Sequence, residues 1–282
     1  MNYVLAVSGG VDSVVLLDML TKTLQGRSLQ KDTKLVVAHF DHGIREDSAA
    51  DARFVQALAS RYGLPFHTER IELGKDASED TARKYRYAFL RTVAKMYNAQ
   101  IVTAHHLDDM VETIAINLRR GTGWRGLAVL NAIDIERPII NMTKREVYKY
   151  ALEHQLEWVE DTSNLEIKYL RNRIRFLTNR LSKEDKERLQ SLRLLQLYVA
   201  KEIDRETIQL QQAWGNKRYP FIMINQPEAI ELLRVYTRRQ LTRPQLLFLW
   251  NAIKTAKPLT KTNNNVRVST QFSLDEFKVS VL

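Results

Sequence analysis

The chain has 282 residues, 44% of them hydrophobic and 27% charged, which is the composition of a globular protein long enough to bury a sizeable core. No apolar run reaches the roughly 18 residues that span a bilayer, and the first residues lack the basic lead and cleavage site of a secretory signal. We therefore expect a soluble, cytoplasmic protein with no membrane partner. The absence of cysteine excludes disulfides, thiolate metal sites and cysteine nucleophiles.

The net charge of +10 is unevenly distributed along the chain. Residues 1–136 carry 17 basic and 17 acidic side chains, residues 137–205 carry 15 and 11, and residues 206–282 carry 11 and 5. A basic excess confined to the second half favours a polyanionic partner that docks there. A basic, solvated surface without a partner is the alternative.

The first 140 residues alternate short β-branched runs with longer amphipathic segments. This alternation predicts a parallel sheet with helices on both faces, a Rossmann-like α/β fold, in which ligands bind beyond the carboxyl ends of the strands. The predicted strands are 3–7, 35–40, 65–71 and 100–105, and the predicted helices are 11–24, 48–62 and 78–97.

The second half is mainly helical. Thr143-x-x-Glu146 is a capping box that opens a helix, and Ser182 caps a long helix that runs to about Trp214. We expect a catalytic domain with this helical extension over residues 1–214, and a small basic α+β domain over residues 215–282. Within the latter, we predict a linker at 215–219, helices near 228–240 and 244–256, and alternating segments near 266–270 and 277–281.

A glycine-rich hexapeptide, Ser8-Gly9-Gly10-Val11-Asp12-Ser13, follows the first predicted strand and opens the first predicted helix. Glycines permit a sharp turn, hydroxyls donate hydrogen bonds, and a helix N-terminus presents N–H groups and a positive dipole. The hexapeptide therefore predicts a phosphate-binding loop. It lacks the Gly-Lys-Ser/Thr of a Walker A loop and the spacing of a dinucleotide fingerprint, so neither ordinary P-loop hydrolysis nor hydride transfer is favoured.

Four of the six histidines lie in two segments that follow the second and fourth strands, residues 39–45 and 103–113. In the latter, Asp109 and Glu112 lie three residues apart on one helical face and can form a negative pocket for an ammonium group. A favourable interaction of acids with the helix dipole is an alternative, which explains Glu112 poorly. A transition-metal site is less favoured, because the adjacent rings of His105 and His106 point in different directions.

Two arginine pairs lie at helical spacing. Arg83 and Arg86 share a face of the predicted helix 78–97, where one of them can reach phosphates; a solvated basic surface is the alternative. Arg171 and Arg175 lie one helical turn apart, which suits clamping a phosphate.

The hexapeptide resembles the signature loop of the N-type ATP pyrophosphatases, which split ATP between its α and β phosphates and activate a substrate oxygen as an adenylate. Over roughly residues 3–180, the series of motifs is similar to that of the tRNA(Ile)-lysidine synthetase family. The family usually has glycine where this chain has Ala104, and its long members have a longer tail. The further matching motifs are His-x-Asp-His-Gly-x-Arg, Ala-Arg-x-x-Arg-Tyr, His-His-x-Asp-Asp-x-x-Glu-Thr, Arg-Gly-Thr-Gly, Arg-Pro, Asp-x-Ser-Asn and Arg-Asn-x-x-Arg.

This resemblance implies a ligase that uses ATP and Mg²⁺. The wobble cytidine of a tRNA(Ile) with a CAU anticodon would be adenylated at its C2 oxygen with release of pyrophosphate, and free L-lysine would then displace AMP to form lysidine. The loop from Ser8 to Ser13 would bind the nucleotide, with Asp12 as the nearest candidate ligand for Mg²⁺. Arg83 and His105 would steady ATP, and the Asp109 and Glu112 pair would bind lysine.

The same resemblance implies that the tRNA contacts the second half of the chain. Arg171, Arg173 and Arg175 would face the cytidine or its phosphate. The long helix 183–214 and the basic tail would hold the tRNA backbone, through arginines that include Arg234, Arg238, Arg239 and Arg243. Tyr236 and Trp250 could stack on bases, whereas burial in a core is the alternative for both.

Two other classes of function compete with this one. The first is another N-type ATP pyrophosphatase ligase, a tRNA thiolase or an ammonia-dependent amide synthetase. Thiolases of this fold generally move sulfur through cysteine or an iron–sulfur cluster, and this chain has no cysteine. The second is a non-enzymatic RNA-binding module with a vestigial nucleotide site, against which the intact hexapeptide and the Asp-Asp-x-x-Glu sequence argue.

Overall fold

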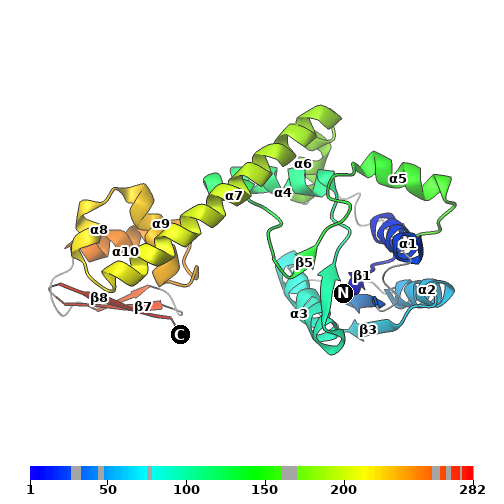
Figure 1. Cartoon of the computed structure of the whole chain (residues 1–282), viewed down its shortest axis with the longest axis horizontal. Helices are drawn as coiled ribbons and strands as arrows, with labels where there is room; N and C mark the ends of the chain where they lie inside the picture. Colours follow the sequence, from blue (N-terminus) through cyan, green and yellow to red (C-terminus); the bar gives the residue numbers. More distant parts are fainter. Residues whose placement is uncertain are drawn as a thin grey trace. The chain divides into compact units, whose positions relative to one another are not determined.

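The computed structural model describes residues 1–26, 33–43, 48–74, 78–160, 170–255, 261–264, 268–273 and 275–281 (Figure 1). The chain forms two compact units. Unit 1 comprises Met1–Gly121 and Val129–Arg193, and unit 2 comprises Thr122–Ala128 and Leu194–Leu282.

Unit 1 is built on a five-stranded parallel sheet with the strand order β3-β2-β1-β4-β5. Its strands are β1 Asn2–Ala6, β2 Leu35–Asp41, β3 Phe66–Arg70, β4 Ala99–Val102 and β5 Ile135–Glu136. The parallel α/β fold expected from the sequence is therefore confirmed. The strand β5 was not predicted, because two residues are too few to show an alternating pattern.

Helices cover both faces of this sheet. Consecutive strand residues point to opposite faces, and Leu5 belongs to a hydrophobic cluster with α1 and α2, whereas Val4 belongs to a second cluster with α3. Figure 1 shows α1 and α2 on one side of β1 and α3 on the other. The helices of unit 1 are α1 Val11–Gly26, α2 Ser48–Arg61, α3 Glu79–Tyr97, α4 Leu107–Arg119, α5 Lys144–Glu153 and α6 Leu170–Thr178.

The capping residues predicted for two helices are confirmed. The Thr143 side chain accepts a hydrogen bond from the Glu146 amide, and the Glu146 carboxylate accepts one from the Thr143 amide, so α5 begins with a complete capping box. The Ser182 hydroxyl accepts a hydrogen bond from the Asp185 amide at 3.1 Å and caps α7, Lys183–Trp214. No helix in the described ranges is both long and apolar enough to cross a membrane.

In unit 2, helices pack against a small antiparallel sheet, so the α+β structure predicted for the tail is confirmed. Its hydrophobic cluster includes Phe221, Leu233, Leu246 and Phe277. Besides the second part of α7, its elements are the 3-10 helix η1 Trp124–Leu127, α8 Tyr219–Met223, α9 Gln226–Tyr236, α10 Arg243–Thr255, β6 Lys261–Asn264, β7 Val268–Phe272 and β8 Phe277–Val281.

The predicted linker at 215–219 is wrong. Arg218 is buried and donates hydrogen bonds to the carbonyls of Ile253 and Ser273, and the Phe277 amide donates to the Asn216 carbonyl at 2.9 Å. Gly215 follows the end of α7 with a φ of 54° and so marks a helix terminus inside a packed unit. The functional division at residue 215 stays a prediction, since the compact units divide within α7.

Candidate active site

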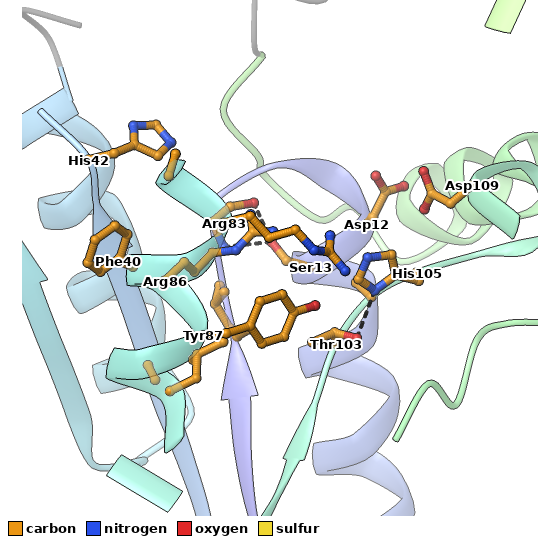
Figure 2. A pocket seen from close by; sticks show the side chains of 17 residues that line it. Asp12, Ser13, Phe40, His42, Arg83, Arg86, Tyr87, Thr103, His105 and Asp109 are labelled. Carbon is orange, nitrogen blue, oxygen red and sulfur yellow. Dashed lines mark hydrogen bonds between the residues drawn. The ribbon is translucent and has the colours of Figure 1, made fainter. Parts of the chain in front are cut away.

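A cavity of about 360 Å³ opens in unit 1 at the carboxyl ends of β1, β2 and β4 (Figure 2). Ligands bind at this edge in parallel α/β sheets, so the cavity lies where the fold predicts a site. Its polar lining comes from the loop after β1, from the residue after β2, from α3 and from the residues after β4, namely Ser8, Asp12, Ser13, His42, Arg83, Arg86, Tyr87, Thr103, His105 and Asp109.

The loop after β1 is folded by its own hydrogen bonds. Gly9 has a φ of 94°, a conformation that residues with a side chain rarely adopt, and its carbonyl accepts a hydrogen bond from the Val159 amide at 2.9 Å. The Ser13 hydroxyl donates to the Gly10 carbonyl at 2.9 Å and accepts from the Ser8 amide at 3.2 Å. The turn therefore presents the first residues of α1 to the cavity, as a phosphate-binding helix N-terminus requires.

The residues of the predicted loop have different positions. Ser8, Asp12 and Ser13 line the cavity, whereas Gly9 and Gly10 supply the turn. The side chain of Val11 is buried in the core at 5% exposure, so only its main chain can contribute to nucleotide binding.

Asp12 is paired with a lysine that no motif marks. The Lys144 ammonium lies 2.7 and 2.8 Å from the two carboxylate oxygens of Asp12, and 4.9 Å from the ring centroid of Tyr148. The Thr143 capping box predicts only that a helix begins at Lys144, and it gives no signal for the pairing with Asp12. Carboxylate oxygens are ligands that Mg²⁺ prefers, so Asp12 can offer one ligand to a metal that also binds phosphate oxygens. Among the described residues, no group of three or more His, Asp or Glu side chains is placed to hold a metal ion by itself.

Arg83 and Arg86 line the cavity from α3, which favours a ligand-binding role over a solvated surface. Their guanidinium carbons lie 4.9 and 5.5 Å from the ring centroid of Tyr87. The N-cap of α3 is Ser78, whose hydroxyl accepts a hydrogen bond from the Thr81 amide. The cap thus fixes the start of the helix that carries the arginines.

His105 lies at the cavity in a neutral form. Burial lowers its pKa to about 3; the nearby carboxylate of Asp109 opposes this shift, and the guanidinium groups of Arg137 and Arg83 add to it. The Nδ1 atom of His105 shares a hydrogen bond with the Thr103 hydroxyl at 2.8 Å. At neutral pH this imidazole is therefore a hydrogen-bonding group and not a cation.

The N-terminus of α4 is capped by side chains of its first residues. The His106 ring accepts a hydrogen bond from the Asp109 amide, and the Asp109 carboxylate accepts one from the His106 amide at 3.1 Å. Asp108 accepts from the Lys144 amide at 2.7 Å and from the buried Lys186 ammonium at 2.6 Å. Burial raises the pKa of Asp108, but these two hydrogen bonds outweigh it and the pKa is lowered.

The two acids of the predicted ammonium pocket lie in different surroundings. Asp109 lines the cavity, whereas Glu112 is 1% exposed, and its Oε1 accepts a hydrogen bond from Arg175 Nε at 2.7 Å. Arg175 thus contacts the acid predicted to bind lysine. Arg173 is exposed on α6, and the side chain of Arg171 lies outside the described residues, as do Arg45 and residues 161–164.

The model of the PP-loop domain family matches residues 1–181. The chain belongs to the PP-loop domain family. It is similar to the tRNA(Ile)-lysidine synthase of Thermotoga sp. (strain RQ2), with 38% identity over 192 residues, which are 65% of this chain and 45% of that protein. It is also similar to the synthase of Thermus thermophilus, with 40% identity over 189 residues, 64% of this chain and 36% of that protein.

The resemblance predicted from the motifs is confirmed, but the chain spans less than half the length of these curated relatives. Among solved structures, the U34-tRNA thiolase NcsA from Methanococcus maripaludis is similar with a TM-score of 0.58 and 18% identity, over 71% of this chain and 72% of that one. At this identity the likeness shows the PP-loop fold alone.

Beyond the PP-loop domain, two of the arginines predicted to bind RNA, Arg234 and Arg239, lie close to acids of unit 2. Arg239 lies 2.6 Å from Asp204, and Arg234 is 20% exposed with its Nε 3.6 Å from Glu231. Arg238 is exposed at the end of α9.

The two aromatic residues considered for base stacking, Tyr236 and Trp250, both pack in the core of unit 2. Tyr236 is buried, with its ring centroid 5.6 Å from that of Phe221. The Trp250 indole donates a hydrogen bond to the Phe221 carbonyl at 3.0 Å and packs against the same cluster. Neither ring is placed as a free platform for a base.

Proposed function

We propose that this PP-loop chain is a tRNA(Ile)-lysidine synthetase of the cytoplasm. It would ligate free L-lysine to C2 of the wobble cytidine of a tRNA(Ile) with a CAU anticodon, using ATP and an adenylated tRNA intermediate. The observation that carries this proposal is a single cavity that joins the phosphate-binding loop after β1 to the Asp109 carboxylate of α4. The identity of 35–40% to curated lysidine synthases over 181–192 residues supports it, as does the match of the family model to residues 1–181, which include the residues of this cavity.

In the first step, the C2 oxygen of the cytidine attacks the α phosphorus of ATP and pyrophosphate leaves. Ser8, Ser13 and the N-terminus of α1 would hold the phosphates, and the guanidinium of Arg83 would offset their charge. Asp12 would hold Mg²⁺, which supplies further charge neutralisation at the phosphate oxygens. The neutral imidazole of His105 would orient the nucleotide through a hydrogen bond.

In the second step, the uncharged ε-amine of lysine attacks C2 of the adenylated base, and AMP leaves with the oxygen that belonged to the cytidine. Asp109 would bind the incoming ammonium and accept its proton. Glu112, which is buried and paired with Arg175, would support the lysine pocket from behind Asp109. Catalysis would be mostly positioning, because holding an amine and an activated base together contributes about 7–11 kcal/mol.

The tRNA would contact arginines of both units. Arg171, Arg173 and Arg175 would lie nearest the cytidine, since Arg175 contacts Glu112 beside the Asp109 end of α4. The basic excess of the second half supports RNA binding by the tail, with Arg238 as an exposed candidate and Arg234 and Arg239 available on release of their acidic partners.

The test is a reaction of the purified chain with ATP, Mg²⁺, lysine and a tRNA(Ile) transcript with a CAU anticodon. We expect AMP and pyrophosphate in equal amounts and a gain of lysine mass on the wobble base. A transcript with uridine at the wobble position is the control and should give neither product. ADP as product, turnover that ignores lysine, or a gain of sulfur mass would exclude this function.

Asp109→Asn tests whether Asp109 binds lysine and not ATP. Because a hydrogen bond to a charged group contributes about 1.5–3 kcal/mol, we expect the KM for lysine to rise about tenfold or more, with little change in the Kd for ATP. Steady-state kinetics with varied lysine and calorimetry with ATP measure the two effects. Equal weakening of both would place the ammonium pocket elsewhere.

A further inference from the structure

The hydroxyl group of Tyr87 is buried and makes no hydrogen bond within the described part of the protein. The residue is 6% exposed, lies on α3, and lines the cavity. Among the residues that the structure describes, no hydrogen-bond partner is present for its hydroxyl. Buried tyrosine hydroxyls nearly always have a partner, so this group calls for one from outside the chain.

The neighbours of the ring explain its position but do not satisfy the hydroxyl. The guanidinium carbons of Arg83, Arg86 and Arg91 lie 4.9, 5.5 and 5.8 Å from the ring centroid, where they interact with the aromatic face. Guanidinium groups only donate hydrogen bonds, so they cannot accept the phenolic proton. A phenylalanine would fill the same space and leave no unpaired group.

Three other hydroxyl groups that line the cavity have partners within the protein. The Ser8 and Ser13 hydroxyls lie 3.3 Å apart, and the Thr103 hydroxyl pairs with His105. Figure 2 shows the Tyr87 hydroxyl pointing toward the part of the cavity where Arg83, Thr103 and His105 lie. It is therefore aimed into the space where a ligand would bind.

We propose that Tyr87 is a nucleotide-binding residue, whose hydroxyl donates a hydrogen bond to an oxygen or nitrogen of bound ATP. This assignment rests on the proposed function for the identity of the ligand. ATP suits this part of the cavity better than lysine does, because Phe40 and Leu90 give it an apolar wall. Figure 2 shows Phe40 on the opposite side of the cavity from the acids Asp12 and Asp109.

Tyr87→Phe tests the proposal, because this variant should bind ATP more weakly without losing stability. Calorimetric titration with ATP and Mg²⁺ should give a Kd about tenfold higher than that of the wild type, which corresponds to about 1.4 kcal/mol. Urea unfolding without ligand should give an unchanged or higher free energy of unfolding, because an unpaired buried group has been removed. A tyrosine that only supports the fold would not give this combination.

Tyr97→Phe is the matched control on the same helix. The Tyr97 hydroxyl pairs with His67 Nε2 at 2.7 Å, and Tyr97 does not line the cavity. This variant should lose stability and keep its affinity for ATP. A Tyr87→Phe variant that binds ATP as tightly as the wild type would overturn the assignment alone, whereas a wild-type chain that binds no ATP would overturn the proposed function with it.

Discussion

Two neighbouring regions of unit 1 use their charged side chains differently. In the cavity after β1, Asp12 and Arg83 remain partly accessible and line a space that a ligand can enter. In the first turns of α4, Asp108 and Glu112 are almost completely buried and contact Lys186 and Arg175. A charged residue in a motif can therefore contact the ligand directly or can hold the shape of the site, and its burial distinguishes the two roles.

The largest effect is expected where a buried pair is broken. Lys186→Met leaves the Asp108 carboxylate buried without its ammonium partner, which should lower the free energy of unfolding by about 3–5 kcal/mol. Urea unfolding measures this change. Lys183→Met is the matched control one turn away on α7, because its pair with Glu146 is exposed, and this variant should unfold like the wild type. Equal losses in both would contradict the comparison.

The next effect concerns activity and not stability. Asp12→Asn removes a carboxylate that is 31% exposed at the cavity, so the chain should fold, while AMP formation should fall by about 10²–10³-fold, the range seen when a transition-state group is lost. Asp80→Asn on α3 is the control, because Asp80 pairs with Lys84 at the exposed surface. Loss of stability in Asp12→Asn without loss of AMP formation would give Asp12 a structural role.

The sequence predicted unit 1 well because its signals are local. Each signal depends on residues that are close together in the sequence, and each is confirmed as a structural feature. The signals are the hexapeptide Ser8–Ser13, the hydrophobic pattern of each strand and helix, and the cap at Thr143. The carboxyl ends of parallel strands then meet at one edge, so the strand-end motifs predicted the position of the cavity.

The partners of the charged residues could not be predicted in the same way. Lys144 contacts Asp12, which lies 132 positions away, and Arg175 contacts Glu112, which lies 63 positions away. No periodicity within a helix reports such pairings, since they depend on how helices pack on the sheet. The unpaired hydroxyl of Tyr87 is likewise visible only once all its neighbours are placed.

His105 is a cavity residue whose charge is set by the fold. With a pKa lowered to about 3 from its usual value, it stays neutral in the native state, while in the unfolded chain it takes up a proton below about pH 6.5. Stability should therefore fall as the pH falls from about 6.5, by up to about 1.4 kcal/mol per pH unit from this group. Urea unfolding of the wild type and of His105→Asn at pH 7 and pH 5 measures it, and the variant should lose less; identical pH dependences would show that His105 binds its proton equally in the folded and unfolded chain.

The smallest effect is expected at Thr143, which joins the two regions. Its cap starts α5 at Lys144, whose amide contacts Asp108 and whose ammonium contacts Asp12. Thr143→Ala should cost about 1 kcal/mol of stability, the usual loss for a helix cap, and should also lower AMP formation because Lys144 is less well held.

Ser182→Ala removes the cap of α7 at a similar cost, but α7 begins with Lys183 and carries no contact to Asp12 among the described residues, so AMP formation should be retained. Measuring unfolding and AMP formation for both variants separates the loss of a cap from the loss of a cation at the nucleotide site. If both variants lose stability and both keep AMP formation, Lys144 has only a structural role, and Asp12 binds its ligands without help from α5.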